Sequence, residues 1–282
     1  MLKSKTYQLL YLSLFSIFVL SFASCNQTVE SIINTVTTVE VTAKERLDSA
    51  NAQALRDYGP GTKLVLIYGR DVNAEGKTRL SLLNAAANPD TISAWLYVYR
   101  VPSDSSLRVY TPNPLITASG CLELTSYFNP TTLISLIQDT TARNIVSGAL
   151  GIITSANVGI TTSSLDLINS NQALNLANAT NPIIRFNSSF TPSSSSMNGN
   201  AFLSGSTSQS RNMFLIPAAG TLNLPAYITN LTGFPADLWI VQYKKNTSQS
   251  LILGTIVQSG QLMGVPIGLQ SAVINLSKDA NE

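Results

Sequence analysis

The sequence predicts an α+β fold with two related halves, in which each half is a small antiparallel sheet packed by a helix. The main observation is a repeated strand, since Trp95-Leu96-Tyr97-Val98-Tyr99-Arg100 matches Trp239-Ile240-Val241-Gln242-Tyr243-Lys244. These are the only two tryptophans, and they lie 239 − 95 = 144 residues apart. The same spacing, with no gap, pairs three further positions: Leu107 with Leu251, Thr111 with Thr255, and Gly120 with Gly264. A helical pattern and a short apolar segment precede each tryptophan, so both are predicted to belong to the repeat.

Residues 1–24 are predicted to be a signal peptide. Lys3 and Lys5 precede an apolar run of about a dozen residues, which is too short to span a membrane as a helix. Small residues then lead to Cys25 in the stretch Ser21-Phe22-Ala23-Ser24-Cys25. This stretch resembles the lipobox of bacterial lipoproteins, although that family usually has Leu at the position of Phe22. The alternative is an ordinary secretory signal that is cut near Ala23 or Ser24.

The lipobox resemblance implies cleavage before Cys25 and acylation of its sulfur and its new amino group. The lipid bilayer is then a partner, since each buried methylene contributes about 0.8 kcal/mol to membrane binding. In that family, a residue such as Asn26 after the cysteine permits transport to an outer membrane. Residues 25–46 would be the lipidated cysteine and a tether that holds the folded part off the bilayer.

The charge of the chain argues against a nucleic-acid partner. Charged residues make up 11% of the sequence, against about 25% in typical domains. The formal charge of +2 comes from Lys3 and Lys5, because 17 − 2 = 15 basic residues balance 15 acidic residues in the rest. No basic cluster occurs, so we expect no nucleic acid to bind.

The chain contains no histidine and two cysteines. The absence of histidine removes Ser-His-Asp and Cys-His catalysis and the commonest zinc and haem ligands. With Cys25 acylated, Cys121 has no partner for an internal disulfide. It is interpreted as a small buried residue near a strand end rather than a reactive thiol. We expect no metal and no cofactor.

The first half is predicted to span residues 47–127. Ala43 to Tyr58 carries apolar residues near helical spacing and is followed by Gly59-Pro60-Gly61, which ends the helix. Leu64 to Tyr68 is predicted as a short strand. Ser93 to Arg100 and Leu107 to Tyr110 are predicted to form a hairpin. Residues 128–162 are interpreted as a connecting apolar helix.

The second half is predicted to span residues 163–276 in the same order. Ser163 to Ala179 is predicted as the helix, and Ile183 to Phe186 as the counterpart of the first short strand. Residues 187–209 are rich in Ser, Asn and Gly and are predicted to be an exposed, inserted loop. Strands follow at residues 236–243, 250–258 and 265–276, and residues 277–282 are a polar tail.

The order of helix, strand, aromatic strand and further strand resembles that of PepSY-like domains of exported bacterial proteins. The residues that carry the resemblance are Ala54-Leu55, Leu64 to Tyr68, Trp95 to Tyr99 and Leu107 to Tyr110, and then Ala173-Leu174, Ile183 to Phe186, Trp239 to Tyr243 and Leu251 to Ile256. The resemblance implies tandem domains that each pack one helix across a short antiparallel sheet. It also implies a binding or protease-inhibitory role outside the cytoplasm.

The aromatic strand faces are the candidate binding site. Trp95, Tyr97 and Tyr99 share one face of their strand, and Trp239 and Tyr243 share one face of theirs. These faces are either a stacking platform for a sugar or peptide or the core under a helix. We favour the core interpretation, because both faces of the first strand are partly apolar.

No catalytic residues are assigned. Asp71 and Glu75 lie in one turn, but their spacing is not that of a calcium loop. No serine lies in G-x-S-x-G or S-x-x-K, and no phosphate-binding loop is present. The sequence also supports no pair of carboxylates on one wall of a site.

Together these observations predict a membrane-anchored exported lipoprotein with a non-enzymatic binding or envelope-structural role. Its partner would be an envelope protein, a peptide or a glycan. The alternatives are an envelope hydrolase that uses carboxylates and an inhibitor of a secreted protease that acts through residues 187–209.

Overall fold

The computed structural model describes most of the chain from residue 40 onward. The described residues are 40–79, 95–112, 120–125, 143–144, 147, 160–161, 167–180, 182, 184–185, 197–206, 210–217, 237–245, 250–262 and 265–276. The predicted signal peptide, Cys25, nearly all of the connecting segment 128–162 and residues 187–196 of the predicted loop lie outside them.

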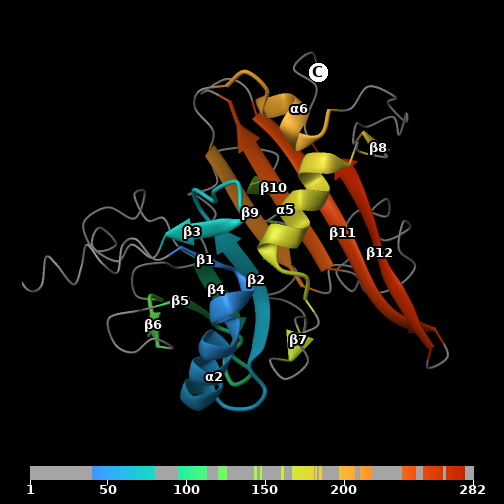
Figure 1. Cartoon of the computed structure of the whole chain (residues 1–282). Coiled ribbons are helices and arrows are strands. Elements are labelled where there is room, and N and C mark those ends of the chain that lie inside the picture. Colours follow the sequence, from blue (N-terminus) through green and yellow to red (C-terminus); the bar gives the residue numbers. More distant parts are fainter. Residues whose placement is uncertain are drawn as a thin grey trace, which may run out of the picture. The chain divides into compact units, whose positions relative to one another are not determined.

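Most of the described elements are strands, which confirms an α+β fold in which strands dominate (Figure 1). The strands are β1 (Glu40–Thr42), β2 (Lys63–Gly69), β3 (Lys77–Arg79), β4 (Trp95–Arg100), β5 (Leu107–Pro112), β6 (Cys121–Glu123), β7 (Ile160–Thr161), β8 (Ile184–Arg185), β9 (Ser210–Ile216), β10 (Asp237–Lys244), β11 (Ser250–Leu262) and β12 (Val265–Asn275). The helices are the 3-10 turn η1 (Lys44–Arg46) and the α-helices α2 (Leu47–Tyr58), α5 (Ser170–Ala179) and α6 (Gly199–Leu203). No helix of the described part is long and apolar enough to cross a membrane.

The two sheets predicted from the sequence are instead one continuous sheet. Its order is β6-β5-β4-β2-β9-β10-β11-β12-β8, with β7 paired to the start of β2. Antiparallel pairing of β2 with β9, through Ile67–Leu215 and Tyr68–Phe214, joins the two sides. From this centre outward the strands follow chain order as far as β6 on one side and β12 on the other, and β8 lies beyond β12. A separate two-stranded sheet pairs β1 with β3, so β1 forms structure within the predicted tether.

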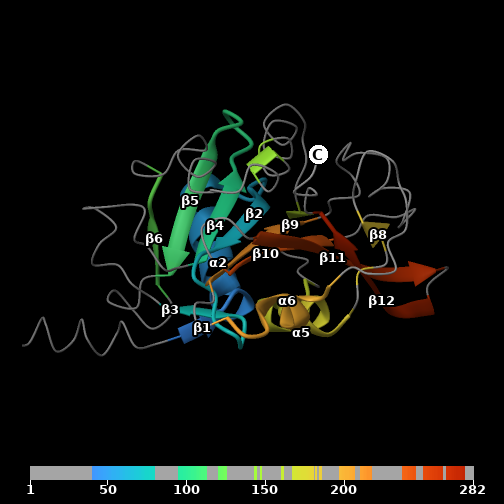
Figure 2. The same ribbon diagram turned by 90° about the horizontal axis from the view of Figure 1, so that it is seen from above.

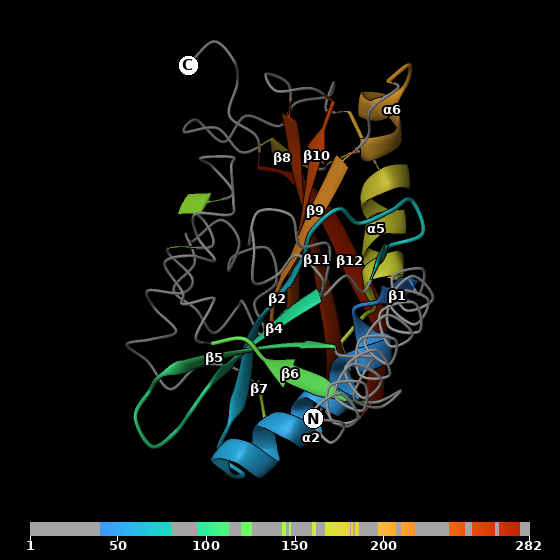
Figure 3. The same ribbon diagram turned by 90° about the vertical axis from the view of Figure 1, so that its left-hand side faces the viewer.

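The helices α2, α5 and α6 lie on one face of the large sheet (Figures 2 and 3). This helix-bearing face contributes the main hydrophobic core, in which Leu47 and Ala50 of α2 and Leu174 and Ala177 of α5 are buried. The amphipathic pattern of each helix explains the burial, because residues three and four apart share one side.

The opposite face of the sheet is also buried. Tyr68 and Phe214 stack there with ring centroids 4.9 Å apart. The neighbouring apolar side chains on this face are at most 2% exposed: Leu66, Leu96, Val98, Val109, Ile216, Leu238, Ile240 and Ile252. Burial of both faces explains why β4 and β10 are apolar at nearly every position instead of alternating cleanly with polar residues.

Two details of the second side differ from the sequence predictions. Its counterpart of β2 is β9, whereas β8 is a two-residue strand that pairs with β12 at the edge of the sheet. Residues 187–209 also include the helix α6, whose Leu203 is 4% exposed. Asn198 caps this helix by accepting a hydrogen bond from the amide of Ala201. The prediction of an exposed loop is therefore wrong at α6.

The predicted ungapped spacing of 144 residues does not hold for the second strand of each hairpin, where the register differs by one residue. Arg100 pairs with Leu107, and Lys244 pairs with Ser250. The connection from β10 to β11 is thus one residue shorter than that from β4 to β5. By register, Leu107 matches Ser250 rather than Leu251.

Candidate functional site

The five aromatic residues predicted as a possible binding site lie inside the core. Trp95, Tyr97 and Tyr99 of β4 are 0% exposed, and Trp239 and Tyr243 of β10 are at most 1% exposed. Alternation along each strand points these rings toward the helices. They are therefore covered side chains and do not form an exposed stacking platform.

Each tryptophan donates a hydrogen bond to the segment that leads into the helix of its own side. Trp95 Nε1 lies 2.8 Å from the carbonyl oxygen of Val41, shortly before α2. Trp239 Nε1 lies 3.2 Å from the carbonyl oxygen of Ile168, shortly before α5. Both indole N–H groups are thus satisfied in the core, as buried polar groups require.

A tyrosine four residues after each tryptophan donates to an asparagine of the same helix. Tyr99 Oη lies 2.6 Å from Asn51 Oδ1 on α2, and Tyr243 Oη lies 2.7 Å from Asn178 Oδ1 on α5. We call the tryptophan and tyrosine hydrogen bonds on each side a helix clamp. In each clamp the two acceptors lie ten residues apart, because 51 − 41 and 178 − 168 are equal.

The two helix clamps meet at the centre of the sheet. The rings of Trp95 and Trp239 contact edge to face, with centroids 6.3 Å apart. Gly69 makes room for the first ring, since a Cβ at that position would lie 2.2 Å from the Trp95 ring. The starts of the two helices are also joined, because Ser170 Oγ accepts from the amide of Ala43 and donates to the carbonyl of Gly76.

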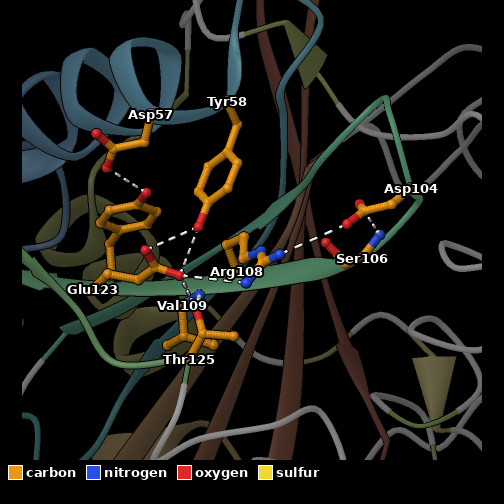
Figure 4. Close-up of polar contacts among 9 residues, drawn as sticks. Asp57, Tyr58, Asp104, Ser106, Arg108, Val109, Glu123 and Thr125 are labelled. Atoms are coloured by element: carbon orange, nitrogen blue, oxygen red, sulfur yellow. Dashed lines mark hydrogen bonds and ion pairs between the residues drawn. The ribbon is translucent and has the colours of Figure 1, made fainter.

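A second group of polar residues lies at the surface, where the end of α2 meets β5 and β6 (Figure 4). We call Asp57, Tyr58, Arg108, Tyr110 and Glu123 the Tyr58 cluster. Tyr58 Oη donates to Glu123, with both carboxylate oxygens at 2.9 Å, and Tyr110 Oη donates to Asp57 Oδ2 at 2.8 Å. The Arg108 guanidinium lies 4.8 Å from the centre of the Tyr58 ring, which is within the range of a cation–π contact.

Further contacts tie the cluster to its surroundings. Arg108 lies 3.7 Å from a carboxylate oxygen of Glu123 and 3.7 Å from one of Asp104. Thr125 Oγ1 donates to Glu123 at 2.7 Å and accepts from the amide of Val109 at 3.0 Å. The side chains of Arg108 and Glu123 are 29% and 32% exposed, so the cluster is partly open to solvent.

The electrostatics of the cluster keep its tyrosines protonated. Burial and the hydrogen bond to Asp57 raise the pKa of Tyr110, and burial and the bond to Glu123 raise the pKa of Tyr58. Each carboxylate therefore accepts a hydrogen bond from a neutral phenol. Such paired groups suit a fixed polar surface better than proton transfer, because a general base needs an acceptor position directed at a substrate.

Sequence reasoning did not identify the Tyr58 cluster. Its members come from three elements that tertiary structure brings together, and no local motif links them. The four-residue spacing of Asp104 and Arg108 is a local signal that could have indicated their ion pair. Nothing local, however, indicates that Tyr58 and Glu123 meet, since they lie 65 residues apart.

The remaining candidates of the sequence have ordinary structural roles. Cys121 is 8% exposed in β6, and burial raises the pKa of its thiol to about 11, as expected for an unreactive cysteine. Asp71 accepts from Ser210 Oγ in the turn between β2 and β3. Within the described residues, no group of three or more His, Cys, Asp or Glu could hold a metal ion.

Comparisons of this chain with protein-family models, with curated proteins and with solved structures find no match.

Proposed function

We propose that the chain is an exported lipoprotein, anchored to a bacterial membrane through an acylated Cys25, with a non-enzymatic binding or envelope-structural role. The observation that carries the proposal is the position of Cys25, directly after a basic segment, an apolar run and small residues. Asn26 favours the outer membrane as the destination, by the resemblance to lipoproteins.

The non-enzymatic role is supported by how the candidate chemical groups are used. The buried aromatic rings hold helices onto the sheet, and the hydroxyls of Tyr58 and Tyr110 donate to Glu123 and Asp57. Partly exposed polar groups of the Tyr58 cluster, including Arg108, suit contact with an envelope protein, a peptide or a glycan. Arginine and tyrosine are both enriched where proteins meet partners.

Labelling with palmitate tests the anchor. The full-length chain should incorporate the label and sediment with membranes, whereas Cys25→Ser should do neither. Cys121→Ser is the matched control, because it removes the other cysteine and should leave both labelling and sedimentation unchanged. Label retained in the Cys25→Ser chain would contradict the proposal.

We further propose that the two sides of the sheet are related halves, each resembling a PepSY-like domain. The support is the matching helix clamps and a shared sequence in the two helices, Leu47-Asp48-Ser49-Ala50-Asn51 and Leu174-Asn175-Leu176-Ala177-Asn178. An experimental structure should superpose residues 41–52 and 95–100 on residues 168–179 and 239–244. A best superposition that fails to match Asn51 with Asn178 would contradict the relationship.

A further inference from the structure

The segment that leads from β1 into η1 lies beside the start of α5 (Figure 3). We call residues 40–44 the strap. Among the described residues, its strand β1 pairs only with β3, in a sheet separate from the large one. Val41, Thr42 and Ala43 are nevertheless at most 5% exposed, so contacts beyond this short ladder cover the strap.

The α2 side of the sheet binds the backbone of the strap through two aromatic residues. Trp95 Nε1 donates to the carbonyl of Val41, and Tyr97 Oη donates to the carbonyl of Ala43, both at 2.8 Å. The strap thus satisfies two donors that are buried in the core. Both acceptors are main-chain oxygens, so these contacts recognise the extended backbone of the strap and not its side chains.

The α5 side binds the same segment at the start of its helix. Asn169 is the N-cap of α5. Its Oδ1 accepts from the amide of Lys44 at 3.0 Å, and its Nδ2 donates to Thr42 Oγ1 at 2.9 Å. Ser170 Oγ accepts from the amide of Ala43 at 3.0 Å. The strap is therefore bound by residues from both sides of the sheet.

The turn between β2 and β3 lies against the same helix start. Ser170 Oγ donates to the carbonyl of Gly76 at 2.6 Å. A Cβ at Gly76 would lie 2.5 Å from the Cα of Asn171, and the φ of Gly76 is +73°, so only glycine suits this contact. One hydroxyl, that of Ser170, thus joins the strap, the turn and α5.

The large sheet does not need the strap for its own pairing. β2 pairs directly with β9 and joins the two sides. The ladder of β1 with β3 has three residue pairs, and a two-stranded ribbon of this kind is marginally stable in water. Segments with few contacts of this type open at a lower free energy than the strands of a core.

We propose that the strap is a releasable fastening, which opens together with the turn between β2 and β3 and the first turn of α5 while the large sheet stays folded. The predicted tether, residues 25–46, ends in the strap, so a pull along the tether reaches the strap before any strand of the large sheet. The open state uncovers Trp95 Nε1, Tyr97 Oη and the Asn169 side chain, which together match the backbone of an extended peptide. The inference depends on these contacts alone and not on acylation of Cys25.

Native-state hydrogen exchange of the full-length chain in low concentrations of urea tests the proposal. The amides of Ala43 and Lys44 should exchange through an opening of lower free energy than the amides of β10, and urea should change their exchange rates little. Urea acts in proportion to the surface that an opening exposes, and the strap exposes far less than the sheet. Equal urea dependence for the strap and for β10 would mean that the strap opens only by global unfolding, which would overturn the proposal.

Two substitutions separate the strap from the sheet. Ser170→Ala removes the hydroxyl that bonds to Ala43 and Gly76, so it should speed exchange of the strap amides about tenfold. Ile240→Val in β10 is the matched control, because it loosens the core at a residue that stays packed when only the strap opens. It should speed exchange of the β10 amides about fivefold and leave the strap amides at their original rate.

Lys44→Met is a milder variant of the strap itself. Lys44 is exposed, and its Nζ donates to the carbonyl of Leu167 at 3.1 Å, so the variant should fold and should speed exchange of the strap amides about threefold relative to their intrinsic rates. Strap amides that respond to Ile240→Val as strongly as those of β10 would contradict the proposal. Strap amides that respond to neither Ser170→Ala nor Lys44→Met would contradict it as well.

Discussion

The α2 side and the α5 side of the sheet hold their helices by the same helix clamp but fill the space around it differently. The clamp residues match in type and spacing, with Trp95 and Tyr99 on one side and Trp239 and Tyr243 on the other. At the position between them, Tyr97 on the α2 side is replaced by Val241 on the α5 side. The shared part is therefore the part that fixes each helix.

The additional tyrosines of the α2 side have their own partners. Tyr97 Oη donates to the carbonyl of Ala43 at 2.8 Å, and Tyr110 Oη donates to Asp57. Leu253 takes the place of Tyr110 on the α5 side by register, and α6 packs there against Tyr243. Strands with the same clamp residues therefore lie next to a polar surface cluster on the α2 side and next to an additional helix, α6, on the α5 side.

The largest effect is expected from removing either tryptophan. Trp95→Ala and Trp239→Ala should each lower the free energy of unfolding by about 3–5 kcal/mol, because each leaves a cavity at the centre of the core. Urea unfolding of both variants measures the loss. Similar losses would support equal roles of the two clamps, and a loss below about 1 kcal/mol at either position would break the comparison.

Two glycines that accommodate clamp rings should differ in sensitivity. A Cβ at Gly69 would lie 2.2 Å from the Trp95 ring, and one at Gly199 would lie 2.3 Å from the Tyr243 ring. Overpacking of this kind costs about 1–3 kcal/mol. Gly69→Ala should cost more than Gly199→Ala in thermal unfolding, because the short helix α6 can shift while the paired strand β2 cannot. The reverse order would contradict this explanation.

The tyrosine hydrogen bonds of the clamps should also differ in strength. Tyr99→Phe leaves the oxygen of Asn51 without its donor at a position that is 4% exposed, so a loss of about 1–3 kcal/mol is expected. Tyr243→Phe should cost less, because Asn178 is only half-buried and water can replace the hydroxyl.

A double variant provides the control for this pair. Asn51→Leu combined with Tyr99→Phe should recover part of the loss of Tyr99→Phe alone, since replacing both partners by apolar groups removes the unsatisfied oxygen. Equal losses for Tyr99→Phe and Tyr243→Phe in urea unfolding would show that burial of the acceptor does not set the difference.

The smallest effect concerns alkaline stability. Burial raises the pKa of Tyr97 well above its usual value, so the folded chain keeps this proton when the unfolded chain loses it. The free energy of unfolding therefore falls as pH rises past about 10, because ionisation of this tyrosine stabilises the unfolded state. Tyr97→Phe should therefore lessen the loss of stability between neutral pH and pH 10.5, by less than about 1 kcal/mol. An unchanged pH dependence would contradict burial as the cause, and a Tyr58→Phe chain is the more exposed control.

Local patterns in the sequence predicted the local structure well. The strands predicted at residues 93–100 and 236–243 are present as β4 and β10, and the helix over Ala43 to Tyr58 agrees closely with η1 and α2. These elements could be predicted because helical and strand periodicity are properties of neighbouring residues. Apolar residues on both faces of the strand at Trp95 to Arg100 predicted that its aromatic face is buried. The structure explains this pattern, because both faces of β4 are covered.

Long-range features could not be predicted in the same way. Pairing of β2 with β9 joins two expected sheets into one, and no local signal specifies it. The sequence comparison placed Leu55 opposite Leu174, whereas the clamp contacts place Asn51 opposite Asn178, a shift of eight residues. The apolar spacing of the two helices allows several alignments of one helix with the other. The match of Asn51 with Asn178 can be selected only when the hydrogen bonds of these residues to Tyr99 and Tyr243 are known.

Tryptophan fluorescence tests most directly the central claim that the paired aromatic faces are core and not binding surface. The chain has only two tryptophans, so Trp95→Phe and Trp239→Phe each leave one reporter. In the folded chain, both reporters should be protected from quenching by acrylamide and should become accessible only on unfolding in urea. Quenching of either reporter in the folded chain as strong as in the unfolded chain would contradict the claim.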